Sequence, residues 1–177
     1  MLPVLTGFLG ISVIMHMDNL MILGFRAKID SVAETLDIID SIRKDDEIIQ
    51  LLNADAIAGE NHIIHGVNQA FLAFEHGENL AKDISVEIAL RCSAQRQISK
   101  AFKILGLREG EMNLCAILIN CEDYTRQLSE HFTLDDGVLG CDTEKLIEIY
   151  DISPDELYNN SVDEVMIDRI TKLNVDY

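Results

Sequence analysis

The feature that most constrains the fold is a run of almost uninterrupted apolar residues from Glu111 to Cys121. It is the longest strand candidate in the chain, and a strand that is apolar on both faces belongs inside a sheet covered on both sides. The run therefore predicts a central strand. Cys115 and Cys121 are an even number of residues apart, so a regular strand would place both thiols on one face.

Two shorter apolar runs, Ile11 to Met15 and Leu20 to Phe25, are too short for helices and have glycine at their edges. They predict two strands joined as a hairpin around residues 17–19. The segment from Glu47 to Asn53 predicts a further strand.

Periodicity and capping residues predict helices along the first two thirds of the chain. Ser31 and Glu34 form a capping box ahead of apolar residues at helical spacing. Glu87 and Arg91 stand four residues apart in the order that favours an ion pair on a helix, and Gly106 is a stop signal after an amphipathic segment. The expected helices cover residues 31–44, 60–76, 83–92 and 95–105.

The acidic C-terminal third carries two successive helix-start signals. Ser153 followed by Pro154 and Glu156 is one such signal, and Ser161 with Glu164 is another. Two starts so close together imply a break near residues 159–160. Because helices outnumber strands and do not alternate strictly with them, we expect an α+β fold in which a small, mainly antiparallel sheet packs with seven to eight helices.

The composition fits a single globular domain over residues 1–177. With 177 residues, 48% hydrophobic content and two prolines, the chain can bury a core, and disorder is not expected. The first apolar run, Leu2 to Met15, lacks a preceding cation and is shorter than the ~20 residues of a membrane span, so we expect a cytoplasmic protein. The four cysteines stand singly and are expected to be reduced thiols in the core. They are Cys92, Cys115, Cys121 and Cys141.

Charge is distributed unevenly along the chain. The net charge of −17 should repel nucleic acid at long range, yet residues 82–108 hold six bases and two acids. Arg96, Lys100 and Lys103 recur at helical spacing on a face separate from the apolar one. Because a cation in the first turn of a helix opposes the helix dipole, we expect Arg96 to face an anion, either an RNA phosphate or an acid elsewhere in the chain.

One face of the helix predicted at residues 60–76 carries His62, His65, Gln69 and His76. A metal site is one interpretation of this face, and an ordinary polar helix face is the other. The spacing is not His-Glu-x-x-His, and no catalytic triad, paired-carboxylate pattern or phosphate loop stands out. The sequence therefore predicts no catalytic residues, no metal and no other cofactor.

The last predicted helix carries apolar residues and one arginine that share a face. Such a stripe usually packs into a core, and the alternative is a surface that lies in the groove of a partner. The residues are Val162, Val165, Met166, Arg169, Ile170 and Leu173.

Two segments carry a family resemblance. One runs from Gln50 to His62 and includes Asp55 and Gly59, and the other runs from Leu90 to Ile98, where Ala94 stands at a position at which family members tend to have glycine. In these segments the chain resembles the small kinase-binding subunit of the KEOPS (EKC) complex, which makes threonylcarbamoyl-adenosine in tRNA. The resemblance covers most of the chain.

This resemblance implies a non-catalytic subunit that binds the small atypical Ser/Thr kinase of the complex, regulates that kinase, and helps to recruit tRNA by its single-stranded acceptor end. It places Arg91 and Arg96 in an RNA-binding segment, and the charge pattern adds Lys82, Lys100 and Lys103. The stripe on the last helix is the candidate kinase-docking surface.

Two other functions are open at this point. One is a small metal-dependent enzyme that uses the face of His62 and His65, and the other is a purely structural protein-interaction module. Metal analysis of the purified protein distinguishes the first from a KEOPS subunit. Binding to tRNA at two salt concentrations distinguishes the second.

Overall fold

The apolar run identified in the sequence forms the middle of a sheet. The computed structural model of the protein describes residues 4–6, 12–14 and 17–175. In it, β5 (Gly110–Ile119) pairs antiparallel with β3 (Leu20–Ile29) on one side and with β4 (Ile48–Asn53) on the other. The short β6 (Thr133–Leu134) completes the order β4-β5-β3-β6. The predicted central strand and antiparallel sheet are therefore confirmed.

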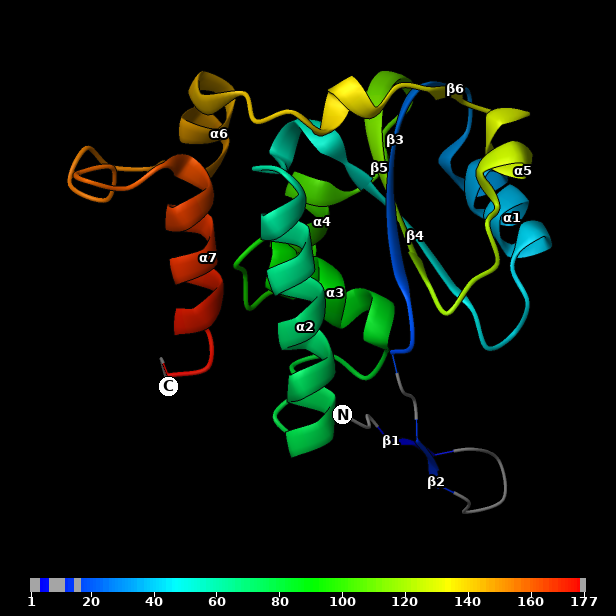
Figure 1. Cartoon of the computed structure of the whole chain (residues 1–177), viewed down its shortest axis with the longest axis horizontal. Coiled ribbons are helices and arrows are strands. Elements are labelled where there is room, and N and C mark those ends of the chain that lie inside the picture. Colours follow the sequence, from blue (N-terminus) through cyan, green and yellow to red (C-terminus); the bar gives the residue numbers. More distant parts are fainter. Residues whose placement is uncertain (1–3, 7–11, 15–16, 176–177) are drawn as a thin grey trace.

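Helices cover both faces of this sheet (Figure 1). One face is covered by α1 (Val32–Ile42) and α5 (Thr125–Ser129), and the other by α2 (Glu60–His76), α3 (Ile84–Cys92) and α4 (Ile98–Leu105). Beyond α2 lie α6 (Thr143–Tyr150) and α7 (Val162–Lys172). The described residues thus form seven α-helices and an antiparallel sheet, which confirms the α+β class. Among them, no helix is both long and apolar enough to cross a membrane.

The sheet separates two hydrophobic cores, because successive side chains of a strand point to opposite faces. Leu52 and Ile117 pack in the core beneath α2 and α3, whereas Leu51 and Leu118 pack in the core beneath α1 and α5. Each of these side chains is at most 7% exposed. Burial of a Leu or Ile side chain contributes about 1.5–3 kcal/mol, so the two covered faces of the sheet are a major source of stability.

A glycine allows α2 and α3 to approach each other closely. A Cβ atom on Gly66 of α2 would collide with the Sγ of Cys92 at the end of α3, and the Cys92 backbone would also be crowded. Protein interiors have little free volume to absorb such a collision. Gly66 therefore sets the distance between these helices.

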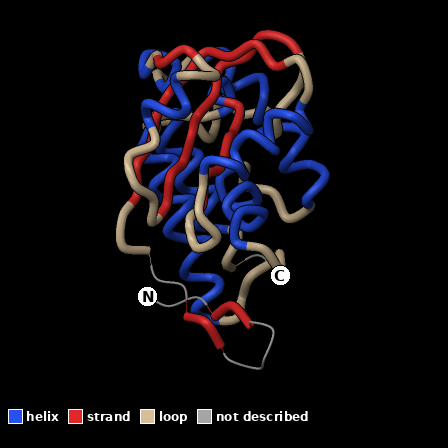
Figure 2. The backbone as a smooth tube through the Cα atoms, turned by 90° about the vertical axis from the view of Figure 1, so that its right-hand side faces the viewer, coloured by secondary structure: helices blue, strands red, loops and turns tan. Residues whose placement is uncertain are grey.

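The predicted hairpin between residues 11–15 and 20–25 is wrong. β2 (Ser12–Ile14) pairs with β1 (Val4–Thr6), and this pair lies away from the four-stranded sheet, at the lower end of Figures 1 and 2. Residues 11 and 15 lie outside the described residues. β3 instead aligns ten residues with β5, and this long register buries far more apolar surface than a local hairpin could.

The expectation for the four cysteines is only partly met. Cys92 and Cys115 are fully buried, and burial raises the pKa of the Cys92 thiol to about 12. Cys121 is half-buried and packs on the opposite side of the sheet from Cys115, because β5 ends at Ile119 and Asn120 turns the chain with a φ of +57°. Cys141 is exposed. The predictions that Cys115 and Cys121 share a face and that Cys141 is buried are therefore wrong.

Ser153 and Glu156, the first predicted helix start in the C-terminal third, form the expected capping hydrogen bonds, but no α-helix follows them. The Ser153 N–H donates to the Glu156 carboxylate over 2.9 Å, and the Glu156 N–H donates to Ser153 Oγ over 3.3 Å. The chain nevertheless continues in turns, and Asn159 adopts a left-handed φ of +62° at the predicted break. The second signal does start a helix, because the capping box of Ser161 and Glu164 stands directly before α7.

Candidate functional site

His62 is the buried centre of the first family-like segment. Its Nδ1 accepts a hydrogen bond from the Ala58 N–H over 2.9 Å, so its Nε2 carries the proton and donates to the Cys92 carbonyl over 2.6 Å. Burial lowers the pKa of His62 to about 4, and the ring is neutral at pH 7. Gly59 precedes α2 with a φ of +90°, a conformation that favours glycine. These residues fasten the start of α2 to the end of α3.

The remaining polar face of α2 meets α7. His65 Nε2 lies 2.8 Å from Thr171 Oγ1, and Gln69 Oε1 accepts from the Asn174 side chain over 2.6 Å. His76 is exposed at the far end of α2. Across residues 4–6, 12–14 and 17–175, no group of three His, Cys, Asp or Glu side chains is placed to hold a metal ion. The histidine face therefore serves helix packing in this structure.

Arg91 lies in the core, and its assignment to RNA binding is corrected. The residue is 1% exposed, and its Nε donates to Glu87 Oε1 over 2.8 Å inside α3. The guanidinium also donates to Asn174 Oδ1 over 2.6 Å, beyond the end of α7. The other Glu87 oxygen accepts the N–H groups of Leu80 and Ala81. The predicted pair of Glu87 and Arg91 exists, but it joins α3 to a loop and to α7 instead of facing solvent.

Arg96 is exposed but lies before α4, not in its first turn. α4 begins at Ile98, so Arg96 lies outside the first turn, where a cation would oppose the helix dipole. The Arg96 guanidinium donates to the carbonyl of Leu173 over 2.7 Å, at the C-terminal end of α7. Cations are favourable at that end of a helix. Arg96, like Arg91, thus holds the end of α7.

Ala94 provides the turn between α3 and α4. Its φ of +53° lies in the left-handed region, which glycine adopts at no steric cost. The Gln95 N–H donates to the Leu90 carbonyl across this turn. The turn geometry is therefore kept here although alanine replaces the glycine that family members tend to have.

The apolar stripe of α7 belongs to the core, which corrects its assignment as a docking surface. Val162, Val165, Met166 and Ile170 are at most 4% exposed and pack with, or beside, the core under α2. Leu173 is half-buried and ends the helix. A partner could reach these four residues only if α7 left the molecule. The outer face of α7 is polar instead.

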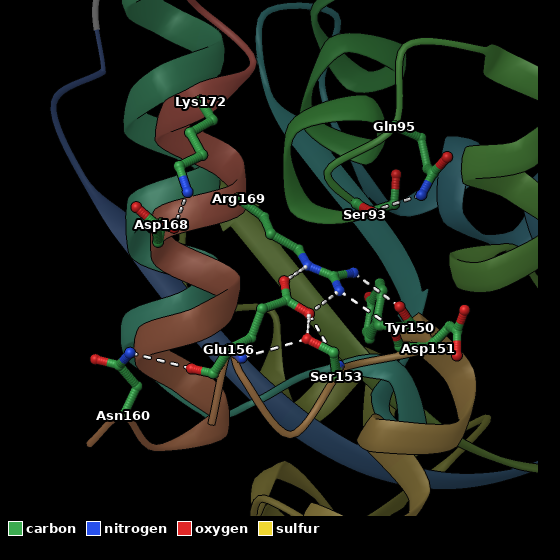
Figure 3. A network of polar contacts seen from close by, with 10 residues as sticks. All are labelled: Ser93, Gln95, Tyr150, Asp151, Ser153, Glu156, Asn160, Asp168, Arg169 and Lys172. Atoms are coloured by element: carbon green, nitrogen blue, oxygen red, sulfur yellow. Dashed lines mark hydrogen bonds and ion pairs between the residues drawn. The ribbon is translucent and has the colours of Figure 1, made fainter. Parts of the chain in front are cut away.

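Arg169, the polar member of that stripe, binds the turn before α7 (Figure 3). Its Nε and Nη2 both reach the Glu156 carboxylate at 2.8 Å, and its Nη1 donates to the Tyr150 carbonyl over 2.7 Å. Hydrogen bonds from Arg169 and from Ser153 lower the pKa of Glu156 to about 2. Arg169 is therefore a structural link from α7 to the end of α6.

A hollow of about 580 Å³ brings four cations together beside α4. Lys100 and Lys103 of α4 line it, and Arg108 after α4 and Lys145 of α6 join them. In a chain of net charge −17, this arrangement makes a candidate anion site. We call it the basic hollow. Its lining includes Lys100, Lys103, Arg108, Lys145, Asp55, Gln95, Ile104 and Ile149.

Asp55, from the first family-like segment, stands at the edge of the basic hollow. Its Oδ1 accepts from the Asn113 side chain over 3.1 Å, and its Oδ2 lies 3.7 Å from the Lys145 ammonium group. A second hollow, of about 380 Å³, shares Asp55 and Arg108 and adds Arg26 and Lys28. Six of the 14 lysine and arginine residues thus line two adjoining hollows.

Part of this site was predicted from the sequence. Lys100 and Lys103 were predicted to bind RNA, and both line the basic hollow. Lys82 is exposed in the loop before α3, and its neighbour Asp83 lines a different hollow. In the sequence, Arg108 is only one of the six bases of residues 82–108. Lys145 lies in an acidic segment, and nothing in the sequence predicts that it belongs to this site. Only the fold brings these two residues to α4.

The comparisons with known proteins agree with the resemblance. The family described as kinase binding protein CGI-121 matches residues 29–173. "Regulatory protein Cgi121" of Methanocaldococcus jannaschii is 36% identical over 121 residues, which cover 66% of this chain and 77% of that protein. "KEOPS complex subunit Cgi121" of Pyrococcus abyssi is 39% identical over 61 residues, which cover 33% of this chain and 36% of that protein. The chain therefore belongs to the CGI-121 family of kinase-binding proteins.

Proposed function

We propose that this protein is the accessory subunit of a cytoplasmic KEOPS complex, in which it binds and regulates the small atypical kinase and helps to hold tRNA for threonylcarbamoyl-adenosine formation. Family membership over residues 29–173 supports the kinase-binding part. The name of the relative from Pyrococcus abyssi supports the complex. The protein contributes binding surfaces and no chemistry of its own.

The basic hollow is the RNA-binding part of this proposal, and its four cations in an acidic chain are the observation that carries it. Lysine and arginine bind phosphates and release counterions, which is the main source of affinity for nucleic acids. Arg91 is left out of the site because it is buried, and Arg96 is left out because its guanidinium is used at the end of α7.

The same hollow suits the end of a single strand. Unpaired bases are bound through their edges and through apolar or planar platforms, whereas bases in a duplex are not accessible in this way. Gln95 and Asp55 offer polar groups beside the cations, and Ile104 and Ile149 offer apolar surface. None of the described residues that line this hollow is aromatic, so we expect weak binding by the subunit alone and stronger binding once the partner subunits add contacts.

Reversal of two charges tests this site. We expect the Lys100→Glu and Lys103→Glu double variant to lose at least about tenfold in tRNA affinity, because it replaces attraction to phosphate with repulsion. The wild-type protein should show a log–log salt slope of about −2, since each of three single-strand phosphate contacts contributes roughly 0.7. The slope should flatten in the variant. Filter binding at several salt concentrations measures both quantities.

The matched control reverses the same number of charges outside the hollow. Lys44→Glu combined with Lys82→Glu gives the same net charge as the test variant, and both lysines are exposed. We expect this control to keep tRNA affinity within about twofold. An equal loss in both variants would mean that only the total charge matters, and an unchanged affinity in the test variant would remove the hollow as the RNA site.

The outer face of α7 is the proposed kinase-docking surface, now that its apolar stripe is known to be buried. Glu164, Asp168 and Lys172 lie on this face, and they line a hollow of about 360 Å³ together with Glu156 and Asn160. Asp168 and Lys172 form an ion pair at 2.7 Å (Figure 3). Exposed ion pairs contribute little to stability, so these side chains can change partners at small cost.

A further inference from the structure

β4 leaves one long edge of the sheet without a partner strand. It pairs with β5 on one side, and within the described part of the chain no strand pairs with its other side. In an antiparallel edge strand, every second residue directs its N–H and C=O groups away from the sheet. Such an edge is a template for an added strand, and four residues of β4, Ile48 to Leu51, line its open side.

A groove of about 570 Å³ runs along this edge. Val32 and Leu36 of α1 form one side, and Phe102 and Leu107 form the other. Leu36 is 49% exposed and Phe102 is 39% exposed, although both are large apolar side chains. Apolar side chains flanking a free strand edge match the alternate side chains of an extended peptide. We call this site the edge groove.

Gln50 in the middle of β4 adds an independent observation. The residue is 8% exposed and lines the edge groove, and its Oε1 is buried without a hydrogen-bond partner among the described residues. Buried polar atoms in native proteins nearly always have a partner. A donor supplied by an occupant of the groove would satisfy this oxygen.

The charges around the edge groove indicate what the occupant carries. Its acidic residues are Asp40, Asp45, Glu47 and Asp83. Among the described residues the one base that lines it is Arg43, which already bonds to Asp40 and to the Glu47 carbonyl. A second copy of this chain would bring the same acidic rim and a net charge of −17 to the contact. Charge complementarity therefore favours a basic partner over self-association.

We propose that β4 binds an extended segment of a partner protein as an added antiparallel or parallel strand, and that this segment alternates apolar residues with lysine or arginine. The apolar residues contact Leu36 and Phe102, and the cations face the acidic rim. This site goes beyond the proposed function, because it uses neither the basic hollow nor the outer face of α7.

Selection from a random peptide library displayed on phage tests the proposal with the full chain as the bait. We expect the enriched peptides to carry an excess of lysine and arginine in alternation with apolar residues. The affinity of these peptides, measured by fluorescence anisotropy, should be at least tenfold lower for the Leu36→Glu variant than for the wild type. Leu36 is exposed, so this substitution should not disturb the fold. The affinity should not change for Leu134→Glu, because Leu134 is 45% exposed on β6 at the opposite edge of the sheet.

N-methylation of an enriched peptide distinguishes strand addition from contact through side chains alone. Methyl groups on one set of alternate residues should cost at least tenfold in affinity, whereas methyl groups on the other set should be tolerated, because only one set faces β4. No enrichment, equal binding to Leu36→Glu, or tolerance of both methylation patterns would overturn the proposal. A concentration-dependent dimer in sedimentation that is lost in Leu36→Glu would also overturn it, in favour of a second copy.

Discussion

Arg91 and Arg96 are five residues apart, and the surroundings of each decide what it can do. The Arg91 guanidinium is buried against Glu87 and Asn174, so solvent does not screen its charge. The desolvation of such a buried pair opposes its Coulomb attraction, but removal of one partner leaves the other buried and uncompensated. Arg96 is exposed, and its guanidinium donates to the Leu173 carbonyl at the surface. The two residues therefore differ greatly in what their loss would cost.

Substitution of the two arginines should show this difference. Arg91→Met is expected to lower the free energy of unfolding by about 3–5 kcal/mol, because the Glu87 carboxylate stays buried without its cation. Arg96→Met is expected to cost only about 1 kcal/mol, because Arg96 is exposed and interactions at the surface contribute little to stability. Urea unfolding measures both values. Equal costs for the two variants would contradict the burial of Arg91.

The bond between Arg169 and Glu156 should make stability depend on pH in the acid range. Hydrogen bonding to Arg169 lowers the folded-state pKa of Glu156 from 4.5 to about 2. The contribution of this ion pair to the free energy of unfolding is therefore complete above pH 4.5 and is lost as the pH falls towards 2. Because both side chains are partly exposed, we expect Arg169→Met to cost only about 1–2 kcal/mol at neutral pH.

The test compares wild type and Arg169→Met by unfolding at several pH values. The difference in the free energy of unfolding should shrink as the pH falls below 4.5, since protonation of Glu156 removes the pair from the wild type as well. A difference that stays constant down to pH 2 would mean that Arg169 acts through its bonds to the Tyr150 and Asp151 carbonyls and not through Glu156.

Some of these residue roles follow from the sequence, and others need the fold. The spacing of Glu87 and Arg91 predicts their pair, but such pairs usually lie on helix surfaces, and only the packing of α3 under a loop and α7 buries this one. Gly59 and His62 stand out in the resemblance. That His62 bonds to the backbone of α3 depends on a contact thirty residues away in sequence.

At the scale of elements, α7 is the best anchored part of the C-terminal third. Its stripe packs beside α2, Arg91 and Arg96 hold its end, and Arg169 holds the preceding turn. These contacts come from three separate segments. α7 is therefore a rigid element whose outer face is presented at a fixed position, which suits a docking surface.

Charge substitutions on the two faces of α7 should separate packing from docking. Ile170→Arg is expected to lower the free energy of unfolding by about 3 kcal/mol or more, because Ile170 is fully buried and a cation in its place would be desolvated. Asp168→Arg on the outer face should cost less than about 1 kcal/mol. Thermal or urea unfolding measures the loss of stability in each of the two variants. A stable Ile170→Arg protein would show that the stripe is not core.

The helices were predicted well where the chain itself carries the signal. The Ser31 cap, the stripe of α2 and the capping box before α7 are local features, and each helix lies where they indicate. The strand pairing was predicted less well. The partner of β3 is β5, some ninety residues later, and a local hairpin competes poorly with that register. The Ser153 signal gives a turn, and its Glu156 also binds Arg169.

At the scale of the whole molecule, charge is sorted into separate surfaces. Six lysine and arginine residues line two adjoining hollows, while acidic residues surround the edge groove and the outer face of α7. A net charge of −17 would oppose nucleic acid if it were spread evenly. The sorting instead gathers cations on one surface, which is what the proposed binding of RNA phosphates needs.

Calorimetric titration of the small atypical kinase into the full chain tests the proposed kinase binding. We expect one kinase to bind per chain. Asp168→Arg should weaken binding at least tenfold while circular dichroism is unchanged, and charge reversal at Lys100 and Lys103 should leave kinase binding as it was. No heat of binding with the wild-type protein, at concentrations where both proteins are folded, would show that this protein does not bind the kinase.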